Sequence, residues 1–524
     1  MSNAFYFNLI LFFLVAIIAL EVLAKKLRWP PAVAQLMGGA IIAFIPGLPA
    51  FEIDPALVLV VFLPPLLMAG AYFTVWHEFR RHLGGILLLA VGAVLFTTLV
   101  VGLALHALTP SLPWAACFAL GAIVSPPDAI AAKAVLQRVA LPRKLLVLLE
   151  GESLLNDATG LVLYKFSLVA VLTGVFSMTA ALEEFAWLSI GGILLGVAFG
   201  YLVYKTLRYL QDTELMILAS ALPGWICYVV GEHIGVSGVI ATVTYGMMLG
   251  WHQHEIMTAT ARRRGAAFWQ IMIFVFESLV FILIGLSLRG VWERILHADA
   301  SLTDYSLQVL LVLAVVIVSR FVWVFALEGV SRLFSRSPSD FHHGWRESFV
   351  KSWAGMRGVV TLAAALAVPA EVPGRDLMLL CAFAVILVTV LFQGTTIGWV
   401  IRLLKLKATH ERTYLNEPQT WARIEQAQYA VVSKLAYDEQ GQLLHPRLLE
   451  QYSYRQSLSD KHKNDAMLPD DIRKAHFSVI LAAVAAGREE LLKLHRSGQI
   501  HDELLHVMER DLDIQEIAAL HSRG

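Results

Sequence analysis

The sequence predicts an all-α integral membrane protein with about 13 transmembrane helices, followed by a helical cytoplasmic tail. The chain of 524 residues is 57% hydrophobic and only 16% charged, a balance that is rare in soluble proteins of this size. Long apolar segments recur up to about residue 405, whereas the remainder is rich in charge. We therefore expect a transmembrane domain at residues 1–407 and a cytoplasmic helical regulatory domain at residues 408–524.

Most of the apolar segments can cross a bilayer as a single helix, since about 20 residues span the hydrocarbon core and a helix satisfies its own backbone amides. The first segment lacks the basic start and the cleavage site of a signal peptide, so we expect a retained helix. The expected spans are residues 5–24, 31–48, 55–73, 83–108, 113–135, 145–173, 185–207, 213–231, 236–252, 268–288, 305–330, 347–369 and 376–401.

The connecting loops alternate in charge, which predicts the orientation. Lysine and arginine gather in every second loop, as at Lys25–Arg28 and Arg262–Arg264, and the other loops carry only Arg289, Arg294 and Arg375. Basic loops stay on the cytoplasmic side of a membrane. We expect an N-terminus outside the cell and a tail inside it.

Two of the expected helices are interrupted. Residues 113–135 contain two prolines within Ser125–Asp128, and residues 347–369 contain two glycines within Gly355–Gly358. Proline removes a backbone donor and clashes with the preceding turn, whereas glycine relaxes the helix. If the spans form two inverted six-helix repeats around a linker, the breaks are at matched positions, where secondary transporters bind their substrates. An ordinary proline kink is the alternative for either break alone.

Buried charges point to a candidate cation site. A carboxylate at the bilayer centre costs about 2.5–3.5 kcal/mol, so it persists only where it is paired, hydrated or functional. In the span at residues 145–173, Ser153 and Asp157 share one helix face. Glu152 and Asn156 share the adjoining face. The oxygen ligands suit a small monovalent cation, and the lack of cysteine and histidine in this group argues against zinc or copper.

The first break supplies further ligands. Asp128 adds a second carboxylate, and the backbone carbonyl of Pro127 becomes available because the helix is interrupted there. We expect Asp157 and Asp128 to hold the metal cation, with a cation and a proton competing for Asp157.

The other buried charges are expected to be structural. Arg357 in the second break needs an anionic partner, and Glu152 is the expected one. Glu277 is expected to support the broken helices, with a ligand role as the alternative. Arg320 is assigned to packing. The alternative in which all these charges merely compensate one another stays open.

Five short motifs follow one another within residues 5–405. They are LPPLL at Leu63–Leu67, SPPD at Ser125–Asp128, GESLLNDA at Gly151–Ala158, FESLVF at Phe276–Phe281 and GMRG at Gly355–Gly358. In order and spacing they resemble the NhaP/NHE-type sodium/proton exchangers, a monovalent cation:proton antiporter family, in the bacterial form with a cytoplasmic tail.

The resemblance implies a 13-helix inverted-repeat fold, a homodimer, and a location in the inner (cytoplasmic) membrane. It implies exchange of Na⁺, or of K⁺ or Li⁺, for protons in pH homeostasis, with no enzymatic activity, no cofactor and no nucleic-acid partner. By resemblance, Asn156, Ser153, Asp128 and the Pro127 carbonyl complete the site around Asp157. An asparagine before the aspartate implies electroneutral exchange, and Glu152 with Arg357 matches the family's structural ion pair.

Two positions depart from the family pattern. Many members carry a carboxylate where this chain has Ala69 and Gly70, and many have a threonine where Pro127 stands. Both differences leave the choice of cation open. A cation channel lined by the same polar residues is the alternative function, and obligatory counterflow of protons distinguishes an antiporter from it.

Overall fold

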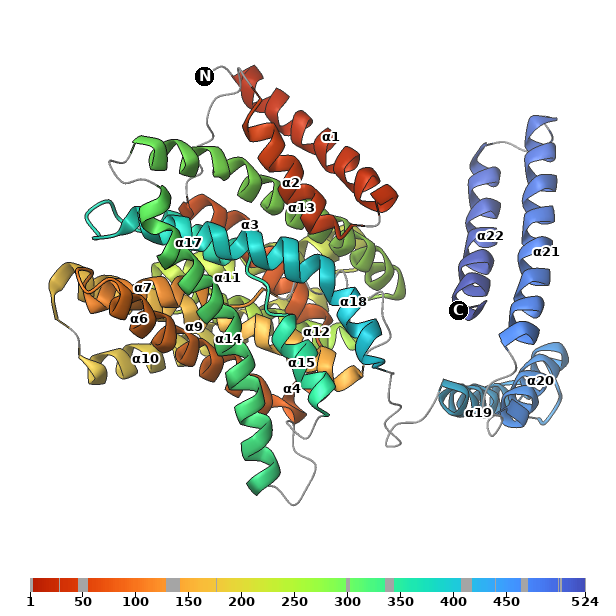
Figure 1. The fold of residues 1–524 in the computed structure, drawn as a ribbon. Coiled ribbons are helices and arrows are strands. Elements are labelled where there is room, and N and C mark those ends of the chain that lie inside the picture. The colour runs from red at the N-terminus through yellow and green to blue at the C-terminus, as the bar shows by residue number, and fades with distance from the viewer. Residues whose placement is uncertain are drawn as a thin grey trace. The chain divides into compact units, whose positions relative to one another are not determined.

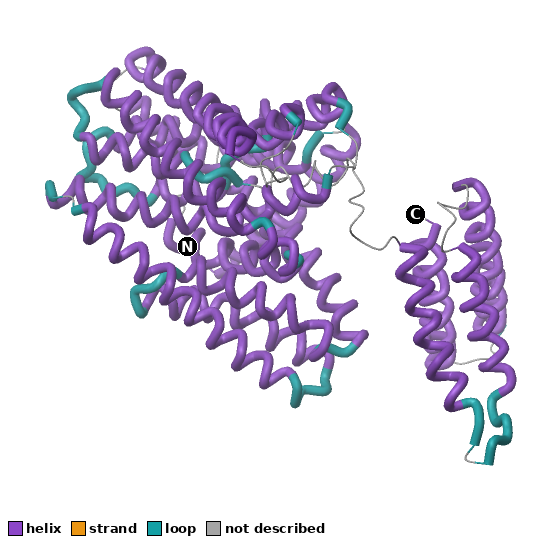
Figure 2. Tube along the Cα trace, turned by 90° about the horizontal axis from the view of Figure 1, so that it is seen from below, coloured by secondary structure: helices purple, strands orange, loops and turns teal. Residues whose placement is uncertain are grey.

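The chain folds into two compact units, Met1–Thr409 and His410–Gly524. The computed structural model describes residues 3–27, 29–45, 55–128, 142–175, 177–297, 302–334, 344–406, 417–438, 440–462, 470–497, 499 and 502–523. Within these ranges both units are built from helices, which are joined by short described loops (Figures 1 and 2).

The first unit contains the apolar segments of the sequence as helices. In chain order they are α1 (Asn3–Leu27), α2 (Pro31–Ala43), α3 (Pro55–Phe73), α4 (Trp76–Arg81), α5 (Leu83–Leu87), the π-helical turn η1 (Leu88–Ala93), α6 (Val94–Leu108), α7 (Trp114–Val124), α9 (Arg143–Thr173), α10 (Met178–Leu207), α11 (Thr213–His233), α12 (Gly238–Ile256), α13 (Ala259–His297), α14 (Leu302–Phe334), α15 (Trp345–Trp353), α16 (Val359–Leu366), α17 (Arg375–Val388), the π-helical turn η2 (Thr389–Gln393) and α18 (Gly394–Leu404).

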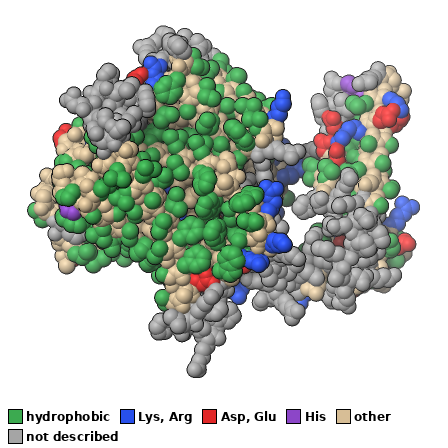
Figure 3. All heavy atoms as spheres, viewed as in Figure 1, with side chains coloured by type: hydrophobic (Ala, Val, Ile, Leu, Met, Phe, Trp, Pro, Cys, Tyr) green, Lys and Arg blue, Asp and Glu red, His purple; other side chains and the backbone are tan. Residues whose placement is uncertain are grey.

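The surface of the first unit is that of a membrane protein. Seven of its described helical segments are long and apolar enough to cross a bilayer. Large side chains such as Trp187, Leu194 and Tyr201 of α10 are about 60% exposed, and hydrophobic side chains cover the face seen in Figure 3. Soluble monomers rarely expose apolar patches of this kind. The first unit is therefore integral to the membrane, while the total of 13 spans stays a prediction.

Both expected helix breaks are present. Helix α7 ends at Val124, directly before the two prolines, and residues 125–128 are non-helical. The expected continuation to residue 135 lies outside the described residues. Helix α15 ends at Trp353 and α16 begins at Val359, with a non-helical segment between them. The backbone N–H of Asp128 donates to the carbonyl of Met356 over 2.6 Å. The two breaks thus meet in the interior of the unit.

The second unit consists of two pairs of helices. Its described helices are α19 (Glu417–Leu435), α20 (Pro446–His462), α21 (Asp470–Arg496) and α22 (Asp502–Arg523). Arg455 of α20 bonds to Glu425 of α19 over 2.7 Å. Arg488 of α21 bonds to two carboxylates of α22, Asp513 at 2.5 Å and Glu516 at 2.6 Å. The described part of the tail is thus helical, as expected, and ion pairs join the two helices of each pair.

Candidate cation site

A cavity of about 70 Å³ lies where α3, the two breaks, α9 and α16 come together. A water molecule needs roughly 10–15 Å³ of such volume, so the cavity can hold an ion with a few waters. It is lined by Leu63, Leu66, Leu67, Gly70, Pro126, Asp128, Glu150, Ser153, Leu154, Asp157, Gly358, Val359, Val360 and Thr361. The lining thus combines polar side chains from the first break, α9 and α16 with apolar side chains, which include those of α3.

Helix α9 contributes one polar face to the cavity. Glu150, Ser153 and Asp157 all line it, because residues three and seven positions apart stack on one side of a helix. The sequence predicted that Ser153 and Asp157 share one helix face, and Glu150 was not among the expected ligands. The same spacing places Glu150 on this face, so the signal that would have identified it was present in the sequence.

Asp128 reaches the cavity from the first break. A Cβ atom on Gly358 would overlap the carboxylate oxygen Oδ2 of Asp128, so only a glycine leaves room for this side chain. The carboxylate lies beside the N-terminus of α16, where unpaired backbone N–H groups favour negative charge. Asp128 and Asp157 thus face one cavity, as the sequence predicted, although they are 29 positions apart.

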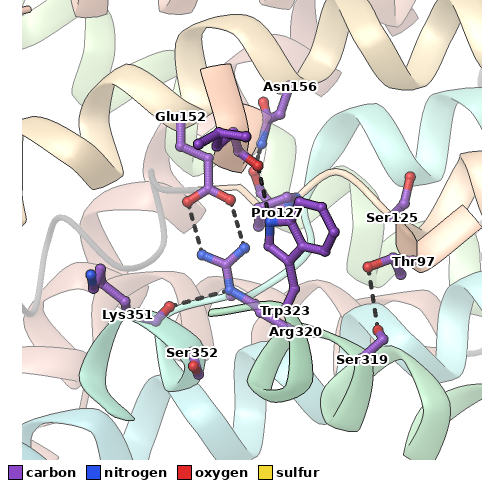
Figure 4. Close-up of polar contacts among 12 residues, drawn as sticks. Thr97, Ser125, Pro127, Glu152, Asn156, Ser319, Arg320, Trp323, Lys351 and Ser352 are labelled. Carbon is purple, nitrogen blue, oxygen red and sulfur yellow. Dashed lines mark hydrogen bonds and ion pairs between the residues drawn. The ribbon is translucent and has the colours of Figure 1, made fainter. Parts of the chain in front are cut away.

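Asn156 and Pro127 are not among the lining residues of the cavity. Asn156 is completely buried, and its side-chain Nδ2 donates to the Pro127 carbonyl (Figure 4). The carbonyl that was expected to bind the cation is therefore engaged by an amide. In this structure Asn156 holds the first break against α9.

Glu152 pairs with Arg320 of α14, and the expected pairing of Glu152 with Arg357 is wrong. Both Nη atoms of Arg320 bond to the Glu152 carboxylate, at 2.6 and 2.9 Å (Figure 4). The Nε atom of Arg320 donates to the Lys351 carbonyl over 3.2 Å. This fork geometry joins α9, α14 and α15, and it makes a buried pair strong because two parallel hydrogen bonds form.

Arg357 is satisfied by backbone carbonyls instead. Its Nε donates to the Val124 carbonyl over 3.0 Å, its Nη2 lies 3.5 Å from the Ser125 carbonyl, and its Nη1 bonds to the Gly355 carbonyl. The last carbonyls of a helix lack helical partners and carry partial negative charge. Arg357 therefore caps the end of α7 and ties the two breaks together, which is why it does not need Glu152.

Glu277 lies on α13, and no residue of that helix is among those that line the cavity. Its neighbour Ser278 accepts a hydrogen bond of 2.7 Å from Gln35, which joins α13 to α2. The cation ligands expected at Asp157 and Asp128 belong to no group of three or more metal-binding side chains among the described residues.

Comparison with known families agrees with the architecture of this site. The profile of a family described as "Sodium/hydrogen exchanger, transmembrane" matches residues 10–403, which is most of the chain and contains every residue of the cavity.

This chain belongs to the transmembrane sodium/hydrogen exchanger family.

Known members of the family resemble the chain over different lengths. The uncharacterized Na(+)/H(+) exchanger YjcE of Escherichia coli (strain K12) is 31% identical over an alignment 549 residues long, which covers 98% of this chain and 98% of that protein. The sodium, potassium, lithium and rubidium/H(+) antiporter of Bacillus subtilis (strain 168) is 33% identical over 375 residues, which cover 69% of this chain and 56% of that protein. The family is one of transporters and not of enzymes.

A solved structure shares the fold. The sodium proton antiporter MjNhaP1 of Methanocaldococcus jannaschii at pH 8 superposes with a TM-score of 0.61 and 20% identity, covering 75% of this chain and 98% of that one. The likeness to the monovalent cation:proton antiporters that the motifs suggested is thereby confirmed at the level of family and fold.

Proposed function

We propose that this exchanger is a secondary active antiporter that moves Na⁺ against H⁺ across the cytoplasmic membrane. The observation that carries the proposal is the convergence of Asp157, Asp128 and Ser153 on one cavity beside two helix breaks that contact each other. Broken helices around a polar site in mid-membrane are the architecture of alternating-access transporters. K⁺ and Li⁺ are further candidate substrates, since the name of the Bacillus subtilis relative includes both.

The coupling mechanism that we propose is competition at Asp157. The carboxylate holds either a cation or a proton, and a site that carries an uncompensated charge crosses the membrane unfavourably. One cation is then exchanged for one proton, and the process is electroneutral. Asp128 and Ser153 supply further oxygen ligands, and Glu150 extends the polar face along α9 by about 10 Å from Asp157, at 1.5 Å per residue.

The residues around the cavity hold its helices and helix breaks in place. Asn156 fixes the first break through the Pro127 carbonyl. The Glu152–Arg320 pair fixes α9 against α14. Arg357 neutralises the end of α7. In the proposed arrangement these groups keep the cavity in shape and do not bind the cation. Glu277 would support the same frame from α13.

The orientation and assembly follow from the charge pattern and the family resemblance. We propose an N-terminus outside the cell, a cytoplasmic tail and a homodimer in the inner membrane. The alternation of basic loops supports this orientation.

Exchange in proteoliposomes tests the proposal. Purified protein is reconstituted with a trapped pH dye, and Na⁺ is added outside. We expect Na⁺-driven proton movement for the natural protein and none for Asp157→Asn. A matched control is Glu184→Gln, which removes an exposed carboxylate at the start of α10 and should leave exchange unchanged. Retained exchange in Asp157→Asn would refute the assignment.

An imposed membrane potential separates this function from its alternative. Electroneutral exchange proceeds at the same rate with or without the potential. A cation channel lined by the same residues would conduct Na⁺ in proportion to the potential and would not require counterflow of protons.

A further inference from the structure

Thr361 carries a buried hydroxyl without a partner. The residue lies in the first turn of α16 and is 1% exposed. Its Oγ1 has no hydrogen-bond partner among the described residues. Thr361 also lines the cavity that contains Asp128 and Asp157. A polar atom that is buried without a hydrogen bond is unfavourable, so this hydroxyl is expected to have a ligand in the functional protein.

Other threonines of the first unit make a side-chain hydrogen bond of a kind that the described residues do not offer to Thr361. A helical threonine ordinarily donates to a carbonyl one turn earlier. Thr159, Thr389 and Thr396 do so, to Leu155 at 3.3 Å, Val385 at 2.7 Å and Phe392 at 2.6 Å. Helix α16 begins only at Val359, so no preceding helical turn offers a carbonyl to Thr361. Its hydroxyl therefore has no acceptor within its own helix.

We propose that the Thr361 hydroxyl is a cation ligand, contributed to the site by the second break. This inference rests on the proposed antiport function and adds to it a neutral oxygen from α16. Pro127 in the first break has no side-chain hydroxyl. The ligand from Thr361 completes a set with the Ser153 hydroxyl and the carboxylates of Asp128 and Asp157. A cation bound there contacts both α9 and α16.

This arrangement gives Thr361 a role in affinity rather than in proton transfer. A hydroxyl can coordinate a cation through its lone pairs while its own proton points to water. It does not titrate, so the competition between cation and proton stays at Asp157. Loss of the hydroxyl should therefore raise the KM for the cation and leave the maximal exchange rate unchanged.

The test compares Thr361→Val, which has nearly the same shape without a hydroxyl, with Thr361→Ser, which keeps the hydroxyl. The KM for Na⁺ is measured in proteoliposomes, and stabilisation by Na⁺ is measured separately as the shift in unfolding temperature of the purified protein. For Thr361→Val we expect the KM to rise by roughly three- to tenfold, the effect of losing one neutral polar contact. The Na⁺-dependent temperature shift should shrink. Thr361→Ser should remain close to the natural protein in both measurements.

Thr159→Val is the matched control, because its hydroxyl is already bonded to Leu155 and the residue does not line the cavity. The inference is overturned if Thr361→Val keeps the natural KM, or if Thr361→Ser shifts it as much as Thr361→Val does. Thr361→Ala replaces the valine variant if that protein does not fold. Failure of the natural protein to exchange Na⁺ for protons would instead overturn the proposed function.

Discussion

Glu152 and Arg320 form a buried ion pair in the first unit, and each side chain is less than 5% exposed. Removing one partner from such a pair leaves an uncompensated charge in a medium of low dielectric constant. Replacing both partners removes the charge altogether. The pair therefore acts as a single structural connection among α9, α14 and α15, and its two halves should be studied together.

For Arg320→Met we expect the protein to lose about 3–5 kcal/mol of stability, because the Glu152 carboxylate is left alone in the interior. The double variant Glu152→Gln with Arg320→Met should recover part of this loss. Thermal unfolding in detergent measures both. Arg402→Met, at an exposed guanidinium whose Nε donates to the carbonyl of Gly398, is the control and should behave as the natural protein. Equal stability of Arg320→Met and this control would contradict the expectation.

Asn156 offers a second test at the scale of single residues. For Asn156→Ala we expect a loss of about 1–3 kcal/mol of stability, because the buried Pro127 carbonyl is left without the Asn156 donor. The KM for Na⁺ should change little, because Asn156 does not line the cavity. A large rise in KM without loss of stability would show that Asn156 is a ligand after all.

At the scale of elements, the two helix breaks act as a pair. A backbone hydrogen bond joins Asp128 to Met356, and Arg357 donates to the end of α7 while its own N–H bonds to Thr389 of η2. The π-helical turn η1 is held in a comparable way, since Trp323 donates to the Leu88 carbonyl over 2.9 Å. Irregular backbone is thus tolerated where side chains satisfy the freed groups.

Gly358→Ala should abolish most of the exchange activity while the protein still folds. The added methyl group would overlap Asp128 Oδ2, so the carboxylate has to leave its place beside α16. Gly329→Ala is the matched control in α14, where an added Cβ meets nothing within 4 Å. Both variants are compared by the rate of Na⁺-driven proton movement per reconstituted protein. An active Gly358→Ala protein would mean that Asp128 is not required at this position.

The breaks were predictable from sequence because their causes are local. Proline and paired glycines act on the turn in which they occur, and the helical period placed Ser153 and Asp157 on one face. The partner of Glu152 was not predictable, because two buried arginines were available and only the three-dimensional fold brings Arg320 rather than Arg357 to its carboxylate. The roles of Asn156 and Thr361 also depend on contacts between distant segments, which no spacing reveals.

At the scale of the whole molecule, the chain divides into a unit that contains the cavity and a unit that contains the tail. All residues of the cavity lie in the first unit, and the family profile ends at residue 403. The second unit has its own ion pairs, between α19 and α20 and between α21 and α22. The expectation that the second unit is a cytoplasmic module that adjusts or stabilises the exchanger stays a prediction.

A protein that ends after Thr409 is expected to retain Na⁺/H⁺ exchange, because it keeps the complete cavity. If the tail is regulatory, the pH at which exchange is half-maximal should shift in the truncated protein. The measurement is the exchange rate across a series of pH values in proteoliposomes. An unchanged profile would assign the tail to structural support alone, and a loss of all exchange in a folded, reconstituted protein would contradict the separation of the two units.

The bond from the Asp128 N–H to the Met356 carbonyl has a consequence for how the site can vary. Both of its atoms belong to the main chain, so almost any amino acid at either position can make it. Substitutions of the side chains around the cavity can therefore change the preferred cation without removing this contact between the two breaks. A proline at residue 128, or an ester in place of the amide there, would remove this link because either lacks the N–H donor.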